Sequence, residues 1–170
     1  MAVIGRRAWQ VDQAHGWRHI AGLTVGQDLS ERDTQLRGAT PQFSLGKSYP
    51  GFTPMGPWLV TPDDFDDPDD LHLTCTLNSE LVQDARTSHM ITPVPALIAG
   101  LSQVVPLSPG DVIYTGTPAG VGMGRRPPRF LNVGDELISH IDGIGDMRHV
   151  MIADATEIAD STTYSQITSP

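Results

Sequence analysis

The sequence predicts a mostly β or α+β fold with one main helix packed on a sheet. Several short runs alternate apolar and polar residues between clusters of turn residues, which is typical of strands. Only residues 93–105 place apolar side chains at helical spacing, and Pro106 ends that pattern. Strands and helices do not alternate along the chain, which argues against a parallel α/β sheet.

The first part of the chain predicts two strands separated by a short helix. Residues 3–11 alternate loosely as a strand, and Asp12 is suited to cap a helix over 12–20. Residues 23–26 predict the next strand. An acid follows Ser30 after three positions, as in a capping box, so a helical turn is expected to begin at Ser30.

The middle of the chain predicts a long loop and then a hairpin. Residues 37–57 are rich in Gly, Pro and Ser and are expected to form an irregular, tightly turned loop. Strands over 71–77 and 81–86 are joined by a tight turn at 78–80. A further strand is expected over residues 111–115.

The end of the chain predicts one more hairpin and a tail. The hairpin begins at Gly134, turns at residues 142–145 and returns to Ala153. Length and composition fit one domain over residues 1–155. The Ser/Thr-rich segment 156–170 is expected to be a polar, flexible tail.

Charge and cysteine content narrow the class of partner. The formal net charge of −9 would repel nucleic acid and anionic membrane, so neither is expected as a partner. Much of the excess lies at residues 63–70, where a solvated acidic loop is favoured over a calcium loop. Cys75 is the single cysteine, and no signal peptide or long apolar run is present, so a cytoplasmic location is expected.

Charged residues after the predicted strand 23–26 are the first candidates for chemistry. Asp28 offers carboxylate oxygens of the kind that Mg²⁺ prefers. Arg32 and Lys47 could anchor an anionic substrate, Arg through a bidentate contact and Lys as a point charge. Helix capping and surface ion pairing are the competing explanations for all three residues.

A glycine-rich run provides a further candidate. Residues 116–124 hold four glycines in nine positions, which indicates either positive φ angles at several of them or a ligand that approaches the main chain closely. Backbone N–H groups there, with the hydroxyls of Thr115 and Thr117, could hold a carboxylate or a developing enolate oxygen. The run matches neither a Walker nor a dinucleotide motif, so nucleotide binding is not expected.

Taken in order, these stretches resemble the C-terminal catalytic domain of the fumarylacetoacetate hydrolase (FAH) family. The resemblance covers nearly everything from Val3 to about Ala153. Its motifs are Gly26-Gln27-Asp28-Leu29-Ser30-Glu31-Arg32-Asp33, Leu45-Gly46-Lys47-Ser48 and Pro109-Gly110-Asp111-Val112-Ile113-Tyr114-Thr115-Gly116-Thr117-Pro118.

The resemblance implies a fold, a cofactor and a set of roles. It implies a mixed β-roll, a homodimer, and a Mg²⁺ or Mn²⁺ ion held by three carboxylates, of which one falls on Asp28. Lys47 and Thr117 fall on catalytic positions. The positions that would contact a small oxo-acid substrate are Arg32, Gln35, Thr115 and Gly116.

Two departures from the family pattern bear on activity. The other two metal carboxylates of the family come from a Glu-x-Glu pair before a strand resembling Val3-Ile4-Gly5, and this sequence lacks that pair. The segment carrying a His–Glu pair in the hydrolases is also absent. A longer N-terminus is the favoured explanation, and the 170-residue chain is expected to bind metal weakly and to have little activity.

The expected function is that of a metal-dependent hydrolase or isomerase acting on 2-oxo or 2,4-dioxo acids in aromatic-compound catabolism. Substrates of the acylpyruvate, fumarylpyruvate or 2-hydroxyhepta-2,4-diene-1,7-dioate type fit the resemblance, and C–C hydrolysis, enol–keto isomerisation and decarboxylation all remain open. The alternative is a catalytically impaired fragment or homologue that serves as a dimerisation or small-acid-binding module.

Overall fold

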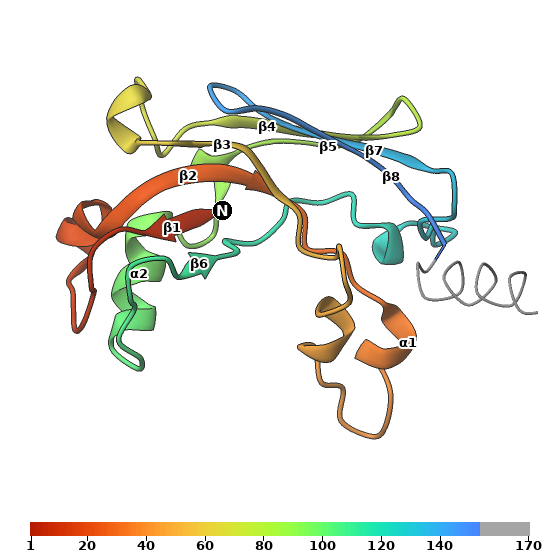
Figure 1. Cartoon of the computed structure of the whole chain (residues 1–170), viewed down its shortest axis with the longest axis horizontal. Coiled ribbons are helices and arrows are strands. Elements are labelled where there is room, and N and C mark those ends of the chain that lie inside the picture. The colour runs from red at the N-terminus through yellow and green to blue at the C-terminus, as the bar shows by residue number, and fades with distance from the viewer. Residues whose placement is uncertain (154–170) are drawn as a thin grey trace, which may run out of the picture.

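The computed structural model describes residues 1–153, which form two four-stranded antiparallel sheets with one main helix (Figure 1). The mostly β or α+β class predicted from the sequence is therefore confirmed. The predicted tail 156–170 lies outside the described residues. The first sheet has the order β3-β2-β1-β6, with β1 at Ala2–Ile4, β2 at Ile20–Gly26, β3 at Met55–Val60 and β6 at Val112–Ile113.

The second sheet has the order β5-β4-β7-β8 and is made of two hairpins. Asn78 and Ser79 turn the first hairpin with positive φ angles of 50° and 70°, as a tight two-residue turn requires. The predicted turn is thus confirmed, with Glu80 already in the next strand. The strands are β4 at His72–Leu77, β5 at Glu80–Arg86, β7 at Glu136–Ile141 and β8 at Gly145–Val150.

Helices are short and connect or cover the sheets. The α-helices are α1 at Arg32–Gln35 and α2 at Val94–Ser102. The 3-10 helices are η1 at Gln13–His19, η2 at Leu45–Lys47, η3 at Pro62–Asp64, η4 at Thr87–His89 and η5 at Gly122–Gly124. Figure 1 shows α2 beside β1, while α1 projects away from the sheets.

The core lies where β2 and β3 pack against β7 and β8 and where α2 closes the first sheet. Leu23 and Val25 of β2 meet Ile144 and Met147 of the last hairpin in one buried cluster. Ile98 of α2 is fully buried in the same cluster, and burial of such a side chain contributes about 1.5–3 kcal/mol. This packing fixes the end of β2, from which the candidate site begins.

The main helix is shorter than its apolar pattern over residues 93–105 predicts, since α2 ends at Ser102. The Ser102 carbonyl accepts a hydrogen bond from the backbone N–H of Gln10 at 3.0 Å, and the Ser102 hydroxyl accepts one from the N–H of Val11 at 3.0 Å. The segment before η1 therefore takes the place of a further helical turn. Val104 is left largely exposed.

Two other local predictions are corrected by the structure. The first strand ends at Ile4, because the pairing of β1 with β2 shifts its register between Val3 and Ile4. The loop predicted over residues 37–57 is interrupted by η2 and gives way to β3, a strand whose apolar residues Trp58 and Leu59 are both exposed and so do not alternate. Periodicity could not reveal such a strand.

The helix caps agree with prediction at one position and differ at another. Asp12 caps η1, as predicted, by accepting a hydrogen bond from the backbone N–H of His15 at 3.1 Å. Ser30 does not cap α1. Glu31 does, because its carboxylate accepts hydrogen bonds from the N–H groups of Asp33 and Thr34, at 2.9 and 2.6 Å, and its longer side chain reaches both.

Candidate active site

Asp28 and Lys47 form an ion pair just beyond the end of β2. The Nζ atom of Lys47 lies 2.6 Å from Oδ2 of Asp28 and 3.0 Å from the hydroxyl oxygen of Ser30. The Lys47 side chain is 30% exposed and the Asp28 side chain 39% exposed, so both can be reached from solvent. Lys47 is the single lysine of the sequence. The structure thus brings together two residues that the sequence analysis selected separately.

Backbone pairing holds Asp28 in place after β2 has ended. The N–H of Gln27 donates to the carbonyl of Pro54 at 3.1 Å, and the N–H of Leu29 donates to the carbonyl of Phe52 at 3.0 Å. These two bonds continue the antiparallel pattern of β2 and β3. Asp28 therefore lies opposite Thr53.

Lys47 is positioned by a close approach of η2 to α1. The backbone N–H of Glu31 donates to the carbonyl of Gly46 at 2.7 Å. A Cβ atom on Gly46 would lie 2.8 Å from the carbonyl oxygen of Glu31, so a larger residue would push the two segments apart. Glycine at this position allows the neighbouring Lys47 to reach Asp28.

Arg32 and Gln35 interact with each other inside α1. The guanidinium of Arg32 donates a hydrogen bond to the side-chain oxygen of Gln35, and the Gln35 residue is only 2% exposed. Gln35 is therefore placed to orient Arg32, whose substrate contact stays a prediction.

The Thr-Gly-Thr-Pro segment, residues 115–118, is hydrogen-bonded to β5. The side-chain amide of Gln83 donates to the hydroxyl of Thr117 at 2.8 Å and to the carbonyl of Pro118 at 3.1 Å. Gly116 has a φ of 109°, a conformation that favours glycine. Within residues 1–153, no hydrogen bond or ion pair links Thr115, Gly116 or Thr117 to Lys47. Their predicted roles in the reaction stay predictions.

Thr115 also lines a small apolar cavity of about 40 Å³ between the two sheets, together with Leu23 and Thr24 of β2. The residue before it, Tyr114, has a buried hydroxyl oxygen with no hydrogen-bond partner among the described residues. Burial raises the pKa of the Tyr114 phenol, the Thr53 hydroxyl lowers it, and the negative charge of Asp28 raises it.

Gln27 precedes Asp28 in the chain, and its side chain contacts residues of the second sheet. Its amide nitrogen donates to the hydroxyl of Ser139 at 2.7 Å and approaches the sulfur of Cys75 at 3.5 Å. Cys75 is 4% exposed, and burial raises the pKa of its thiol. A buried structural cysteine fits these contacts better than a nucleophile.

Asp28 supplies only part of what a divalent cation needs. The residues that the structure describes contain no group of three or more His, Cys, Asp or Glu side chains placed to hold a metal ion. The one carboxylate at the site is instead neutralised by Lys47. The described residues by themselves therefore do not fit a three-carboxylate metal centre.

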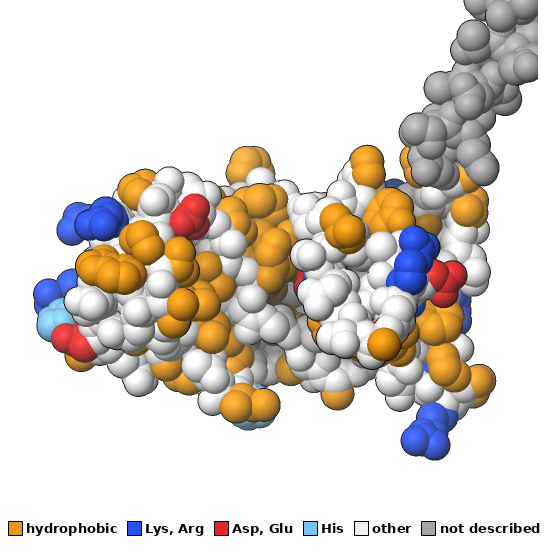
Figure 2. All heavy atoms as spheres, turned by 90° about the horizontal axis from the view of Figure 1, so that it is seen from below, with side chains coloured by type: hydrophobic (Ala, Val, Ile, Leu, Met, Phe, Trp, Pro, Cys, Tyr) orange, Lys and Arg blue, Asp and Glu red, His pale blue; other side chains and the backbone are white. Residues whose placement is uncertain are grey.

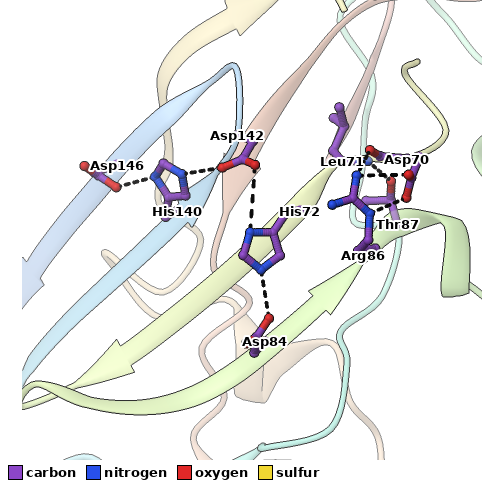
Figure 3. A network of polar contacts seen from close by, with 9 residues as sticks. All are labelled: Asp70, Leu71, His72, Asp84, Arg86, Thr87, His140, Asp142 and Asp146. Carbon is purple, nitrogen blue, oxygen red and sulfur yellow. Dashed lines mark hydrogen bonds and ion pairs between the residues drawn. The ribbon is translucent and has the colours of Figure 1, made fainter. Parts of the chain in front are cut away.

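A second polar cluster lies on the sheet of β4, β5, β7 and β8, as Figure 3 shows. His140 is held between Asp146, at 2.6 Å, and Asp142, at 3.0 Å. His72 lies 2.8 Å from Asp84 and 3.8 Å from Asp142, so Asp142 connects the two imidazoles. These contacts join all four strands of the sheet.

The two sheets and the ordered motifs around Asp28, Lys47 and Thr117 define a known class of catalytic domain. Residues 1–152 match the family model described as fumarylacetoacetate (FAA) hydrolase C-terminal. The chain belongs to the fumarylacetoacetate hydrolase family.

Relatives and solved structures show the range of activities in this family. The chain is 45% identical over 143 residues to a Homo sapiens protein named "Oxaloacetate tautomerase FAHD2A, mitochondrial". A crystal structure of 2-hydroxyhepta-2,4-diene-1,7-dioate isomerase from Mycobacterium marinum is 40% identical with a TM-score of 0.77. Fumarylpyruvate hydrolase from Pseudomonas aeruginosa, in complex with Mn²⁺ and pyruvate, is 26% identical with a TM-score of 0.80. Family members thus include hydrolases, isomerases and tautomerases.

The chain spans only part of these proteins. The match to the human tautomerase covers 84% of this chain and 46% of that protein. The match to the isomerase covers 89% of this chain and 55% of the other, and the match to the hydrolase covers 90% and 63%.

Two findings bear on location within the cell. No helix among the described residues has the length and apolar character needed to cross a membrane. The human relative is named as a mitochondrial protein, and the cytoplasmic location expected for this chain stays a prediction.

Proposed function

We propose that this chain carries the oxo-acid-binding part of an enzyme that hydrolyses or isomerises small 2-oxo or 2,4-dioxo acids. The names of the relatives support this substrate class, because oxaloacetate, fumarylpyruvate and 2-hydroxyhepta-2,4-diene-1,7-dioate all contain a 2-oxo acid or its enol. The acylpyruvate and 2-hydroxyhepta-2,4-diene-1,7-dioate types would place the enzyme in aromatic-compound catabolism.

The observation that carries the proposal is the accessible pair of Lys47 and Asp28. The ammonium of Lys47 is a point charge at the end of a flexible stem, suited to a substrate carboxylate or to the oxygen of an enolate. When a tautomerase removes a proton from C3 of oxaloacetate, negative charge develops on the C2 oxygen, and the proton is later returned to that oxygen or to C3. A fixed cation stabilises this charge in the transition state.

Other residues of the chain have supporting roles in the proposal. Arg32, oriented by Gln35, would bind the distal carboxylate of the substrate. The Thr115-Gly116-Thr117 segment would contribute backbone N–H groups and hydroxyls to an oxygen of the bound acid. The hydrogen bond from Gln83 to Thr117 supports this role, since it holds the segment in one conformation before substrate binds.

The proposal assigns one described residue, Asp28, to the binding of a divalent cation, Mg²⁺ or Mn²⁺. A bound ion of this kind supplies Lewis-acid chemistry in enzymes, and Asp28 would be one of its ligands. The described residues do not complete such a site.

We further propose that the protein is a homodimer. Large apolar side chains are exposed on the edge strand β3, where Trp58 is 69% and Leu59 51% exposed. Figure 2 shows further hydrophobic side chains, in separate groups, on the face seen from below. Contiguous exposed apolar patches on a protein surface can serve as protein–protein interfaces. Sedimentation velocity tests the proposal, with Trp58→Ser expected to shift a dimer toward monomer and a monomeric wild type contradicting it.

The oxo-acid proposal can be tested through the chemistry of one amine. Lys47 is the single lysine, so acetylation by acetic anhydride, followed by peptide mass analysis, reports on one side chain. Oxaloacetate and pyruvate are expected to slow acetylation of Lys47, whereas succinate, which lacks the 2-oxo group, is expected to protect less. A lysine-containing peptide added to the sample serves as the reference for reagent strength.

The same experiment separates the enzyme from a small-acid-binding module. Protection of Lys47 together with oxaloacetate tautomerisation that Lys47→Met abolishes supports the enzyme. Protection without turnover, in this chain and in a longer protein that contains it, supports the module. Equal acetylation with and without every oxo acid contradicts both.

A further inference from the structure

Gln83 of β5 determines the direction of its hydrogen bond with the hydroxyl of Thr117. The side-chain nitrogen of Gln83 lies 3.1 Å from the carbonyl oxygen of Pro118 and 2.8 Å from the hydroxyl oxygen of Thr117. A carbonyl can only accept a hydrogen bond, so the atom of Gln83 that faces Pro118 must be the NH₂ nitrogen rather than the amide oxygen. One N–H of this group therefore donates to Pro118 and the other to Thr117.

The Thr117 hydroxyl keeps its own hydrogen for another group. A hydroxyl has one hydrogen to donate and two lone pairs that accept, and here one lone pair accepts from Gln83. Among residues 1–153, no acceptor is hydrogen-bonded to the Thr117 hydroxyl. Thr117 is also exposed, so a ligand can reach this donor.

The backbone of the same segment lies directly against β5. A Cβ atom on Gly120 would lie 1.8 Å from the carbonyl oxygen of Val82 and 2.9 Å from Cγ of Gln83. Only glycine allows so close an approach of the two main chains. The contact between Gln83 and Thr117 is thus set by the path of the backbone as well as by the side chains.

The strand register places Gln83 on the face of the sheet that Gln27 also contacts. Gln83 pairs with Cys75, and Cys75 pairs with Ser139, so the three side chains lie in one row on one face. Gln27, which follows β2, donates to Ser139 and approaches Cys75. Neighbouring strands are about 4.8 Å apart, so the Thr117 segment and the end of β2 meet this row at neighbouring places.

We propose that Gln83 is a positioning residue that makes the Thr117 hydroxyl a donor to an oxygen of the bound oxo acid. The oxygens of a 2-oxo group, an enolate and a carboxylate are all acceptors, so a hydroxyl held as a donor suits each of them. The inference rests on the proposed function for the identity of the acceptor. The direction of the hydrogen bond rests on Gln83 and Pro118 alone.

NMR of the side-chain amide tests this direction without any ligand. The two Nε2 hydrogens of Gln83 are followed in the wild type and in Thr117→Val. The hydrogen that points to Thr117 should change its chemical shift, whereas the one bonded to the Pro118 carbonyl should keep its shift. A response of neither hydrogen would mean that the amide oxygen faces Thr117, and it would overturn the inference.

Titration with pyruvate, followed in the same spectra, tests the effect on binding. Thr117→Val should weaken pyruvate binding roughly tenfold, the loss of one hydrogen bond to a charged group. Gln83→Met keeps the length of the side chain but has no N–H. It should weaken binding about twofold to tenfold when Thr117 is present and should have no effect in the Thr117→Val background.

Equal weakening by Gln83→Met in both backgrounds would indicate a purely structural role and overturn the inference. Gln103→Met is the matched control, because Gln103 donates to the carbonyl of Val11, and pyruvate affinity should not change. Lack of any response to pyruvate in the wild type, in this chain and in a longer protein that contains it, would contradict the proposed function. The Gln83 hydrogens would still decide the direction of the bond, so the two failures are distinguishable.

Discussion

The Lys47 ammonium lies 2.6 Å from the Asp28 carboxylate, although 19 residues separate them in the chain. The two residues come from different elements: Asp28 follows β2, and Lys47 ends η2. The close contact of Gly46 with Glu31 joins these elements. The pair is consequently a product of the fold of residues 26–54 and reports on whether that region is intact.

Lys47→Met is expected to separate ligand binding from stability. The ion pair is about one-third exposed and should contribute less than about 1 kcal/mol to the free energy of unfolding. Affinity for pyruvate, measured by calorimetry, should fall at least about tenfold because the anion loses its charged partner. Arg148→Met, at an exposed ion pair with Glu136, is the control and should retain affinity. Unchanged pyruvate affinity in Lys47→Met would contradict the role of Lys47.

The chain by itself is expected to bind Mn²⁺ weakly. Asp28 is one carboxylate where a stable site needs several, and the described residues group no three such ligands. Titration followed by electron paramagnetic resonance should show low affinity that Asp28→Ala reduces further. Tight binding that survives Asp28→Ala would place the metal elsewhere and refute this prediction.

Gly120→Ala is expected to be strongly destabilising. Gly120 has a φ of 112°, and a Cβ atom there would lie 1.8 Å from the carbonyl oxygen of Val82. Strain and the clash together should cost at least about 2 kcal/mol. Gly124→Ala is the control, because its Cβ would meet nothing within 4 Å. Similar urea midpoints for the two variants would show that the segment after Pro118 does not hold its contact with β5.

Asp135 is expected to make the protein sensitive to acid. Its carboxylate accepts hydrogen bonds from the backbone N–H of Asn132 and from the side chains of Arg129 and Asn78, at 2.6 to 2.8 Å. These contacts lower the pKa of Asp135 from 3.8 to about 2. A lowered pKa means that the stabilisation is complete above about pH 3.8 and is lost as pH falls through about 2.

The variant Asp135→Asn tests this assignment. It should lower the melting temperature at pH 7 and flatten the dependence of stability on pH between 4 and 2, as measured by calorimetry. Asp63→Asn, in the acidic stretch around η3, is a control for the change in net charge. An acid transition identical to that of the wild type would exclude Asp135 as its source.

His140 is expected to make the protein less stable as pH rises above 6.5. Its contacts with Asp142 and Asp146 raise the pKa of the imidazole from 6.5, with the Asp142 hydrogen bond as the largest cause (Figure 3). A raised pKa means that the stabilisation is complete below pH 6.5 and is lost as pH rises through the higher folded value. Because His140 is 36% exposed, solvent screening keeps the effect small.

His140→Gln should therefore reduce the decline in melting temperature above pH 6.5. His89→Gln is the matched control, since His89 lies in η4 and outside the His140–Asp142–Asp146 contacts. If both variants lose stability above neutral pH as the wild type does, the network does not set this dependence.

The sequence by itself determined the class of the fold, most of its strands and the family. Alternating runs gave β4, β5 and the last hairpin because each of these pairs with its neighbour through a short turn that is local in sequence. The motifs around Asp28, Lys47 and Thr117 indicated the family, since their residue types and order are visible without a structure.

Only the tertiary structure decided how these motifs meet. The contact of Lys47 with Asp28, the end of α2 at Ser102 and the buried hydroxyl of Tyr114 all depend on partners distant in sequence. The strand β3 could not be predicted either, because its neighbouring apolar residues Trp58 and Leu59 are both exposed and do not alternate. Periodicity reports which side of an element faces the core, whereas these features depend on what lies across from it.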